Sequence, residues 1–162
     1  MRKEEIINVL RIAEKTISTA ESCTGGLVSK LITDIPGASE IFQYGFVTYS
    51  DEAKINILGV DEETLKKHTA VSEQVAIQMA KGAMDKSGSY IGLSVTGYAG
   101  GCMKGTTQDG TVFIAVVNKN GYEKVTKYHW SDSSRSTIRD WASEAAFNLI
   151  LEGALKNGRG IL

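Results

Sequence analysis

Two possible nucleophiles stand side by side in the segment ESCTGG, which begins at Glu21. Ser22 offers a hydroxyl group and Cys23 a thiol. The run TIST before them is typical of a short strand, and the apolar residues after them recur at helical spacing. Both side chains therefore fall on a strand-to-helix turn, where free N–H groups can bind an anion or an oxyanion. Because neighbouring side chains of an extended segment point to opposite sides, only one of the two can face a pocket.

A serine nucleophile needs a base close by, and the sequence contains no obvious Ser-His-Asp set. His68 lies in a charged helical stretch and His129 stands near a strand end beside Trp130, so we interpret both histidines as surface or boundary residues and not as catalytic bases. A lysine can replace histidine when its surroundings keep the amine neutral, as in Ser-Lys variants of the triad. Lys54, in the segment TYSDEAK, is the candidate. The alternative is a helix lysine that faces solvent.

Two arginines near the end of the chain form a possible phosphate-binding site. Arg135 and Arg139 are four residues apart, so they share one face of the helix expected to begin near Ser133. Guanidinium groups beside the free N–H donors of a helix N-terminus suit a phosphate monoester. The alternative is an ordinary exposed helix face, with Asp132 and Asp140 as local ion-pair partners.

The predicted elements alternate between strands and helices. An amphipathic helix opens the chain, Asp61 and Ser72 are predicted N-caps, and the Asn-Gly pair of NKNG predicts a hairpin. Strands are predicted at about residues 16–22, 41–50, 90–97, 110–117 and 122–130, and helices near 6–13, 27–36, 51–58, 62–68, 73–86 and from 133 onward. This alternation favours an α/β fold in which a mixed sheet has helices on both faces.

Three polar corners, ESCTGG, TYSDEAK and TGYAGG, each follow a predicted strand. Ligands of open α/β sheets collect outside the carboxyl ends of the strands. If the three strands are parallel neighbours, the corners converge on one pocket. Taken singly, each corner can equally be an ordinary turn between a strand and a helix.

Length and charge exclude several classes of protein. A chain of 162 residues, 42% of them hydrophobic, is expected to form a single domain over residues 1–162. Its net charge of −1 argues against nonspecific binding to nucleic acid or membranes, and no apolar run is long enough to span a bilayer. The first residues lack the apolar core of a secretion signal, so Cys23 and Cys102 are expected as free thiols in the cytoplasm. Two histidines and two cysteines far apart match no ligand spacing, and no metal is expected.

Five segments of the chain closely resemble the C-terminal domain of the CinA competence/damage-inducible family. They are TAESCTGGLVSKLITDIPGAS, FVTYSDEAKINILGV, HTAVSEQVAIQMAKGA, SVTGYAG and GTVFIAV, and together they cover nearly the whole chain. The chain is similar to the stand-alone nicotinamide-nucleotide amidases of this family, and we expect this stand-alone form and not a full-length CinA protein with its N-terminal domain. The resemblance implies a three-layer α/β/α sandwich around a mixed, mostly parallel sheet. It also implies that a cytoplasmic homo-oligomer hydrolyses the carboxamide of nicotinamide mononucleotide, giving nicotinate mononucleotide and ammonia without a metal or redox cofactor.

The resemblance also assigns roles to residues. The Ser-Lys dyad of the family falls on Ser22 and Lys54, which makes Cys23 the neighbour that faces away. Glu21 and Tyr49 are expected to orient this dyad. The residues expected at the oxyanion hole and the substrate are Thr24, Gly25, Gly26, Thr48, Gly97 and Gly100, and those expected at the 5′-phosphate are Arg135 and Arg139.

The third corner departs from the usual family sequence. The family continues it as SGIAGPxGG and ends it with KPVGTV, whereas this chain reads TGYAGGCMKGTTQDGTV, without either proline. Near the last helix, WSDSSRSTIR keeps both arginines and loses the glycine of FxGDRxxIR. The loop from Tyr98 to Asp109 is rich in glycine and threonine, including Gly100, Gly101, Thr106 and Thr107, and we expect a flexible flap that sets selectivity. Two alternatives are a dyad that acts on a different amide and a nucleotide-binding module without catalysis.

Overall fold

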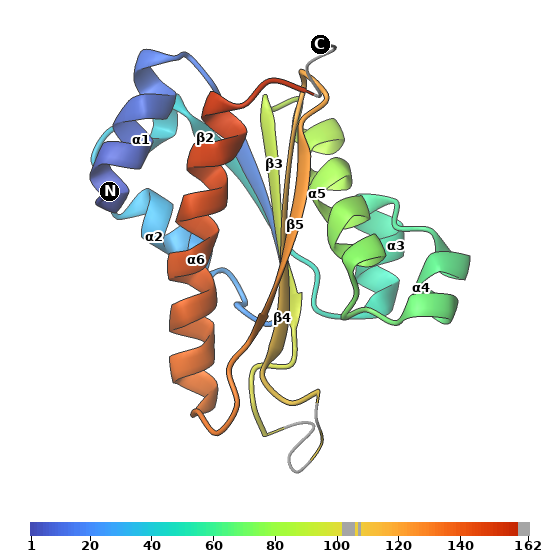
Figure 1. Ribbon diagram of the computed structural model, residues 1–162. Coiled ribbons are helices and arrows are strands. Elements are labelled where there is room, and N and C mark those ends of the chain that lie inside the picture. Colours follow the sequence, from blue (N-terminus) through green and yellow to red (C-terminus); the bar gives the residue numbers. More distant parts are fainter. Residues whose placement is uncertain (102–105, 107, 159–162) are drawn as a thin grey trace.

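A five-stranded sheet forms the middle of the protein (Figure 1). The computed structural model describes residues 1–101, 106 and 108–158. The strands are β1 (Ile17–Glu21), β2 (Phe42–Val47), β3 (Ile91–Gly97), β4 (Thr111–Asn118) and β5 (Glu123–His129). In the spatial order β2-β1-β3-β4-β5, β1 pairs in parallel with β2 and β3, and β4 pairs antiparallel with β3 and β5. Four of the five strands therefore run in one direction, and the predicted hairpin between β4 and β5 is confirmed.

Helices cover both faces of the sheet, as Figure 1 shows. One face carries α1 (Lys3–Ile12), α2 (Leu27–Thr33) and α6 (Arg135–Leu155), and the other carries α3 (Asp51–Leu58), α4 (Glu62–His68) and α5 (Glu73–Ser87). A short 3-10 helix, η1 (Ala38–Glu40), leads from α2 into β2. The predicted fold, a three-layer α/β/α sandwich around a mixed, mostly parallel sheet, is confirmed.

Side-chain caps fix the points at which four helices begin. Asp61 and Ser72 each accept a hydrogen bond from an N–H group in the first turn of α4 and α5, as the sequence predicted. Ser50 and Ser134 do the same for α3 and α6. Such caps satisfy N–H groups that have no partner within the helix. The helices α3 and α6, which carry candidate site residues, thus start at defined points beside the strand ends.

The core lies on both sides of the central strands. β4 is buried along its whole length and β3 along all but its last residue. On the α3 side, a Cβ at Gly82 of α5 would lie 2.1 Å from the carbonyl oxygen of Leu58, so this glycine lets α3 lie directly against α5. That contact sets the position of the helix that carries Lys54.

None of the described helices combines the length and apolar character needed to cross a bilayer.

The candidate site residues gather at one end of the sheet. Because β1, β2 and β3 are parallel, their carboxyl ends share this end. β5 runs the same way and leads into the N-terminus of α6, which lies beside them (Figure 1). All three polar corners predicted from the sequence follow these strand ends.

Candidate active site

Ser22 follows β1 directly and begins the turn into α2. Its N–H group donates to the carbonyl of Val95 in β3 (2.9 Å), and the residue is 9% exposed. Gly25 and Gly26 come next, with φ angles of 59° and 100°. This left-handed conformation strongly favours glycine, so the two glycines allow the tight turn that presents Ser22.

Lys54 brings an amine to Ser22 from α3. The lysine is only 1% exposed, and its Nζ lies 3.1 Å from the Ser22 Oγ. The same Nζ donates to the main-chain carbonyls of Thr48 (2.8 Å) and Tyr49 (3.2 Å). Burial lowers the pKa of Lys54 from its ordinary value, and the nearby Asp51 carboxylate opposes this shift. The surroundings therefore favour the neutral amine more than water does.

The three hydrogen-bond partners of the Lys54 amine determine which proton-transfer role this amine can take. Two of them are carbonyls, which only accept hydrogen bonds, so they take two N–H donors. In the neutral amine the third position carries the lone pair, and this position faces the Ser22 hydroxyl. Such an amine can accept the hydroxyl proton, as a general base must. The solvent-facing lysine that the sequence left open is excluded, because this side chain is buried.

Cys23 points into the apolar core on the α1, α2 and α6 face of the sheet. It is buried, and burial raises the pKa of its thiol to about 12. Since the thiolate is the reactive form of cysteine, this thiol is inert near neutral pH. Of the two possible nucleophiles, Ser22 alone has a base beside it among the described residues. The second cysteine, Cys102, lies outside the described residues.

The Glu21 side chain stabilises the turn between β1 and α2 that carries Ser22. Its side chain is fully buried, and its Oε1 accepts hydrogen bonds from the N–H (2.8 Å) and the hydroxyl (3.3 Å) of Ser29. Gly26, at the N-cap of α2, has no side chain for this purpose, so the Glu21 carboxyl caps the helix in its place. Burial raises the pKa of Glu21, while hydrogen bonds from the N–H groups of Ser29 and Gly26 oppose that shift.

Three of the six buried polar atoms that lack a hydrogen-bond partner among the described residues lie in the two corners that form the dyad. Within the described part of the chain, Glu21 Oε2, Thr24 Oγ1 and Thr48 Oγ1 are buried without a hydrogen-bond partner. Buried polar groups are nearly always paired in folded proteins, so each exception calls for an explanation.

The predicted phosphate arginines reach the dyad from the first turns of α6. Arg135 donates through Nη2 to the Tyr49 hydroxyl (2.8 Å) and through Nη1 to the Gly100 carbonyl (3.3 Å). Arg139 donates through Nη2 to the Thr24 carbonyl (3.0 Å). These contacts link the corner after β1, the corner after β2 and the loop after β3, so the structure brings the three corners together at this helix.

Neither arginine follows the alternative of local ion pairing. Among the described residues, Arg135 and Arg139 make no salt bridge with Asp132 or Asp140. The two guanidinium groups instead donate hydrogen bonds to neutral oxygen atoms, which bind a cation more weakly than an anion does. Both guanidinium groups therefore retain the capacity to bind an anionic ligand more strongly.

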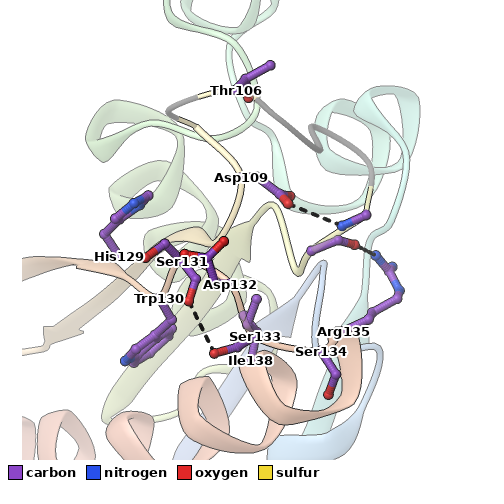
Figure 2. A pocket seen from close by; sticks show the side chains of 12 residues that line it. Thr106, Asp109, His129, Trp130, Ser131, Asp132, Ser133, Ser134, Arg135 and Ile138 are labelled. Carbon is purple, nitrogen blue, oxygen red and sulfur yellow. Dashed lines mark hydrogen bonds between the residues drawn. The ribbon is translucent and has the colours of Figure 1, made fainter.

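A cavity of about 890 Å³ opens beside Arg135 (Figure 2). Its lining includes Gly100 from the loop after β3, Trp130 from the end of β5 and Ile138 from α6. Ser22 is not part of the described lining, so the cavity adjoins the dyad and does not contain it. Arg135 donates to the Gly100 carbonyl, and its second contact, with Tyr49, connects the cavity to the dyad. Residues 102–105 and 107 of the predicted flap lie outside the described residues, and the flap stays a prediction.

The structure gives Gly97 a packing role. A Cβ at this position would lie 2.7 Å from the carbonyl oxygen of Thr111, so the glycine allows β3 and β4 to pair closely where β3 ends. Sequence reasoning missed two other residues. Ser29 holds Glu21 and could have been found as the third helical residue after a glycine N-cap, whereas nothing in the sequence marked Trp130 as a cavity residue.

The model of the CinA C-terminal domain family matches residues 1–154 of the chain. The chain belongs to this family. It is 40% identical over 157 residues to an Escherichia coli (strain K12) protein named nicotinamide-nucleotide amidohydrolase PncC, which covers 95% of this chain and 93% of the relative. A crystal structure of a competence/damage-inducible protein from Agrobacterium tumefaciens superposes with a TM-score of 0.87 at 36% identity, covering 93% of this chain and 94% of that one.

Other members of the family are longer. A CinA-like protein of Chloroherpeton thalassium is 46% identical over 155 residues, which are 93% of this chain and only 36% of the relative. The chain thus spans about a third of the length of such relatives. The sequence-based assignment to the CinA C-terminal domain family is confirmed, and the roles of individual residues in catalysis stay predictions.

Proposed function

We propose that the protein is an amidohydrolase that converts nicotinamide mononucleotide to nicotinate mononucleotide and ammonia. The observation that carries the proposal is the buried Lys54 amine, 3.1 Å from the Ser22 hydroxyl and held there by two main-chain carbonyls. The name of the Escherichia coli relative, which aligns over nearly its full length, supports the substrate class. The proposal takes residues 1–162 as a single domain that works in the cytoplasm.

The reaction would begin with attack by Ser22 on the carboxamide carbon. As the Ser22 oxygen forms its bond to that carbon, its proton passes to the Lys54 amine, and the carbonyl oxygen becomes an oxyanion. The oxyanion collapses, the carbon–nitrogen bond breaks, and Lys54 gives the proton to the departing nitrogen, which leaves as ammonia. Water then attacks the ester on Ser22, Lys54 takes a proton from this water and returns it to Ser22, and nicotinate mononucleotide is released.

The oxyanion needs N–H donors aimed at the place where its charge develops. Of the predicted donors, the Gly25 N–H already donates to the Ser22 carbonyl (3.0 Å), and the Gly26 N–H interacts with the Glu21 carboxyl. The N–H groups of Cys23 and Thr24 donate to no other residue in the described part of the chain. We assign the oxyanion to these two, with Glu21 and Tyr49 as residues that position the turn and the amine.

The 5′-phosphate of the nucleotide is assigned to Arg135 and Arg139. Both arginines lie in the first turns of α6, Arg135 lines the cavity, and both guanidinium groups donate to neutral oxygen atoms. A phosphate would replace these partners with charge-assisted, bidentate hydrogen bonds. The assignment puts the nicotinamide near Ser22 and the phosphate toward the cavity that Gly100 and Arg135 line.

An ammonia-release assay with nicotinamide mononucleotide, run beside Ser22→Ala, tests the proposal. Release by the wild-type protein and none by the variant is the expected result. If the nucleotide raises the melting temperature of the wild-type protein without ammonia release, the protein is a nucleotide-binding module without catalysis. Release only from another amide in a substrate panel would replace the proposed substrate and keep the dyad.

A further inference from the structure

The cavity beside Arg135 also contains a carboxylate. Asp109, two residues before the start of β4, lines this cavity together with Arg135 (Figure 2). The family pattern KPVGTV ends in the same Gly-Thr-Val as residues 110–112 of this chain, and it has a valine where Asp109 stands. The chain therefore has an anionic side chain in the cavity at a place where the family usually has an apolar one.

The Asp109 carboxylate has few partners in the folded chain. Its Oδ2 accepts one long hydrogen bond, from the Gly101 N–H at 3.4 Å, and its Oδ1 is buried without a partner among the described residues. No described lysine or arginine forms a salt bridge with it. An ionised carboxylate accepts hydrogen bonds at both oxygens, and buried polar atoms are nearly always paired. This carboxylate therefore has the capacity to accept hydrogen bonds from a ligand.

Asp109 and Arg135 contact opposite sides of one peptide group. Arg135 donates through Nη1 to the Gly100 carbonyl, and Asp109 accepts from the N–H of Gly101, which belongs to the same peptide group. The carbonyl and the N–H of a trans peptide point in opposite directions, so this group keeps the two charges apart. Arg135 Nη1 and Asp109 Oδ2 nevertheless lie within about 9 Å of each other. The cavity thus presents a cation and an anion that are separated by a short span.

We propose that Asp109 binds the ribose diol of the nucleotide whose phosphate is assigned to Arg135. This step rests on the proposed function and adds to it a residue that selects the sugar. The two hydroxyl groups of the diol are hydrogen-bond donors, and a carboxylate accepts from such groups, as the acidic residue of dinucleotide-binding folds does from the ribose 2′-hydroxyl. The phosphate and the diol of one ribosyl group are only a few covalent bonds apart, which suits the span between Arg135 and Asp109.

The arrangement of charges favours this class of ligand over others. An anion without hydroxyl groups would leave the Asp109 carboxylate unpaired, and a simple cation would be repelled by Arg135. His129 and Asp132 also line the cavity, but the His129 Nδ1 already contacts the Thr111 hydroxyl (3.1 Å), and Asp132 is exposed to solvent. Asp109 is half-buried, and a hydrogen bond that is shielded from water is electrostatically stronger.

Calorimetry with nicotinamide mononucleotide and its 2′-deoxy and 3′-deoxy analogues tests the proposal. The Ser22→Ala protein is used so that no ligand is turned over. It should bind the nucleotide at least about tenfold more tightly than one of the analogues, because that analogue lacks a donor to a charged acceptor. Asp109→Val, added to the same protein, should remove most of this preference. Asp132→Asn, which removes the exposed carboxylate of the same cavity, is the matched control and should keep it.

A second variant and a second pair of ligands separate the possible failures. If Asp109→Val does not fold, Asp109→Asn, which keeps the size of the side chain and loses its charge, should lower the preference in the same direction. If no nicotinamide nucleotide binds, the proposed function fails, and the protein should still prefer ribose 5-phosphate to 2-deoxyribose 5-phosphate through Asp109. A preference that is absent from the protein with Asp109 intact, that survives in the Asp109 variants or that disappears in Asp132→Asn would overturn the proposal. Equal losses of affinity for all ligands in the Asp109 variants would also overturn it.

Discussion

The two halves of the candidate site are built in opposite ways. The buried half consists of Ser22 and Lys54, which are 9% and 1% exposed and are held by main-chain contacts from β1, β2 and β3. The open half consists of Arg135, Arg139 and the cavity of about 890 Å³ that Arg135 lines. A rigid, buried pair fixes reaction geometry, while an open loop region can change without disturbing it. The sequence departs from the family pattern in the loop of the open half, and the buried half keeps its motifs.

The largest effect is expected from the buried half. Ser22→Ala and Lys54→Ala should each lower kcat by roughly 10⁴-fold, because each removes one partner of the proton transfer. The double variant should be little worse than either single variant, since the two residues act as a unit. Lys30→Ala, which removes an exposed lysine from α2, serves as the control. Turnover of Lys54→Ala near the wild-type rate would refute the dyad.

A smaller effect is expected from the open half. A hydrogen bond to a charged group is worth about 1.5–3 kcal/mol, so Arg135→Ala should weaken nucleotide binding by roughly tenfold to a hundredfold. The variant should bind the riboside that lacks the phosphate as tightly as the wild-type protein does. Calorimetry with both ligands measures the two affinities. Arg11→Ala, at the C-terminal end of α1, is the matched control. Equal losses for nucleotide and riboside would remove the phosphate role from Arg135.

The pH dependence of the rate tests the state of the Lys54 amine. A general base must be unprotonated, so kcat/KM should rise by about tenfold per pH unit on the acid side of the Lys54 pKa and then level off. Because burial lowers this pKa, the midpoint should fall below the ordinary lysine value of 10.5. A midpoint at or above pH 10.5 would show that burial has not lowered the pKa of Lys54.

The same pKa shift should affect stability. Between the lowered folded-state pKa of Lys54 and the unfolded value of 10.5, the unfolded chain binds more protons than the folded one. The contribution of this lysine to the free energy of unfolding should therefore rise with pH across that window. Urea unfolding at several pH values should show that Lys54→Met removes this rise, and an identical slope in the variant would contradict it.

The smallest effect is expected from the neighbour of the nucleophile. Cys23→Ala should leave kcat near the wild-type value, because the thiol lies in the core and holds its proton. The smaller side chain should lower the free energy of unfolding by about 1 kcal/mol. An acyl-thioester on Cys23, detected by mass spectrometry, together with a loss of activity as deep as that of Ser22→Ala, would reverse the assignment.

The fold was largely predictable because its elements carry local signals. The predicted helices at 62–68 and 73–86 agree with α4 and α5 to within one residue, since Asp61 and Ser72 mark their starts. The spatial order of the strands carries no such signal. The amino-acid sequence of β2 does not indicate that this strand lies at an edge of the sheet. Its edge position follows from pairing with β1 alone, which depends on the arrangement of the other strands.

The site was predictable in its motifs and not in its geometry. Lys54 lies in a helix with charged neighbours, and its sequence alone favours exposure to solvent. Its burial arises from the packing of α3 against α5, which brings together residues far apart in the chain. The close approach of Gly97 to β4 carried no signal in the sequence either, and its expected contact with the substrate stays a prediction.

The carbonyls that hold the Lys54 amine come from the end of β2, and this has a consequence for refolding. In the folded protein, Ser22 and Lys54 meet because β2 pairs with β1 and α3 folds back after β2. No fragment of the chain that lacks this crossover can assemble the nucleophile and its base. After dilution from denaturant, recovery of turnover should therefore lag behind the return of the helical signal. The onset of ammonia release would then report the pairing of the parallel strands β1 and β2.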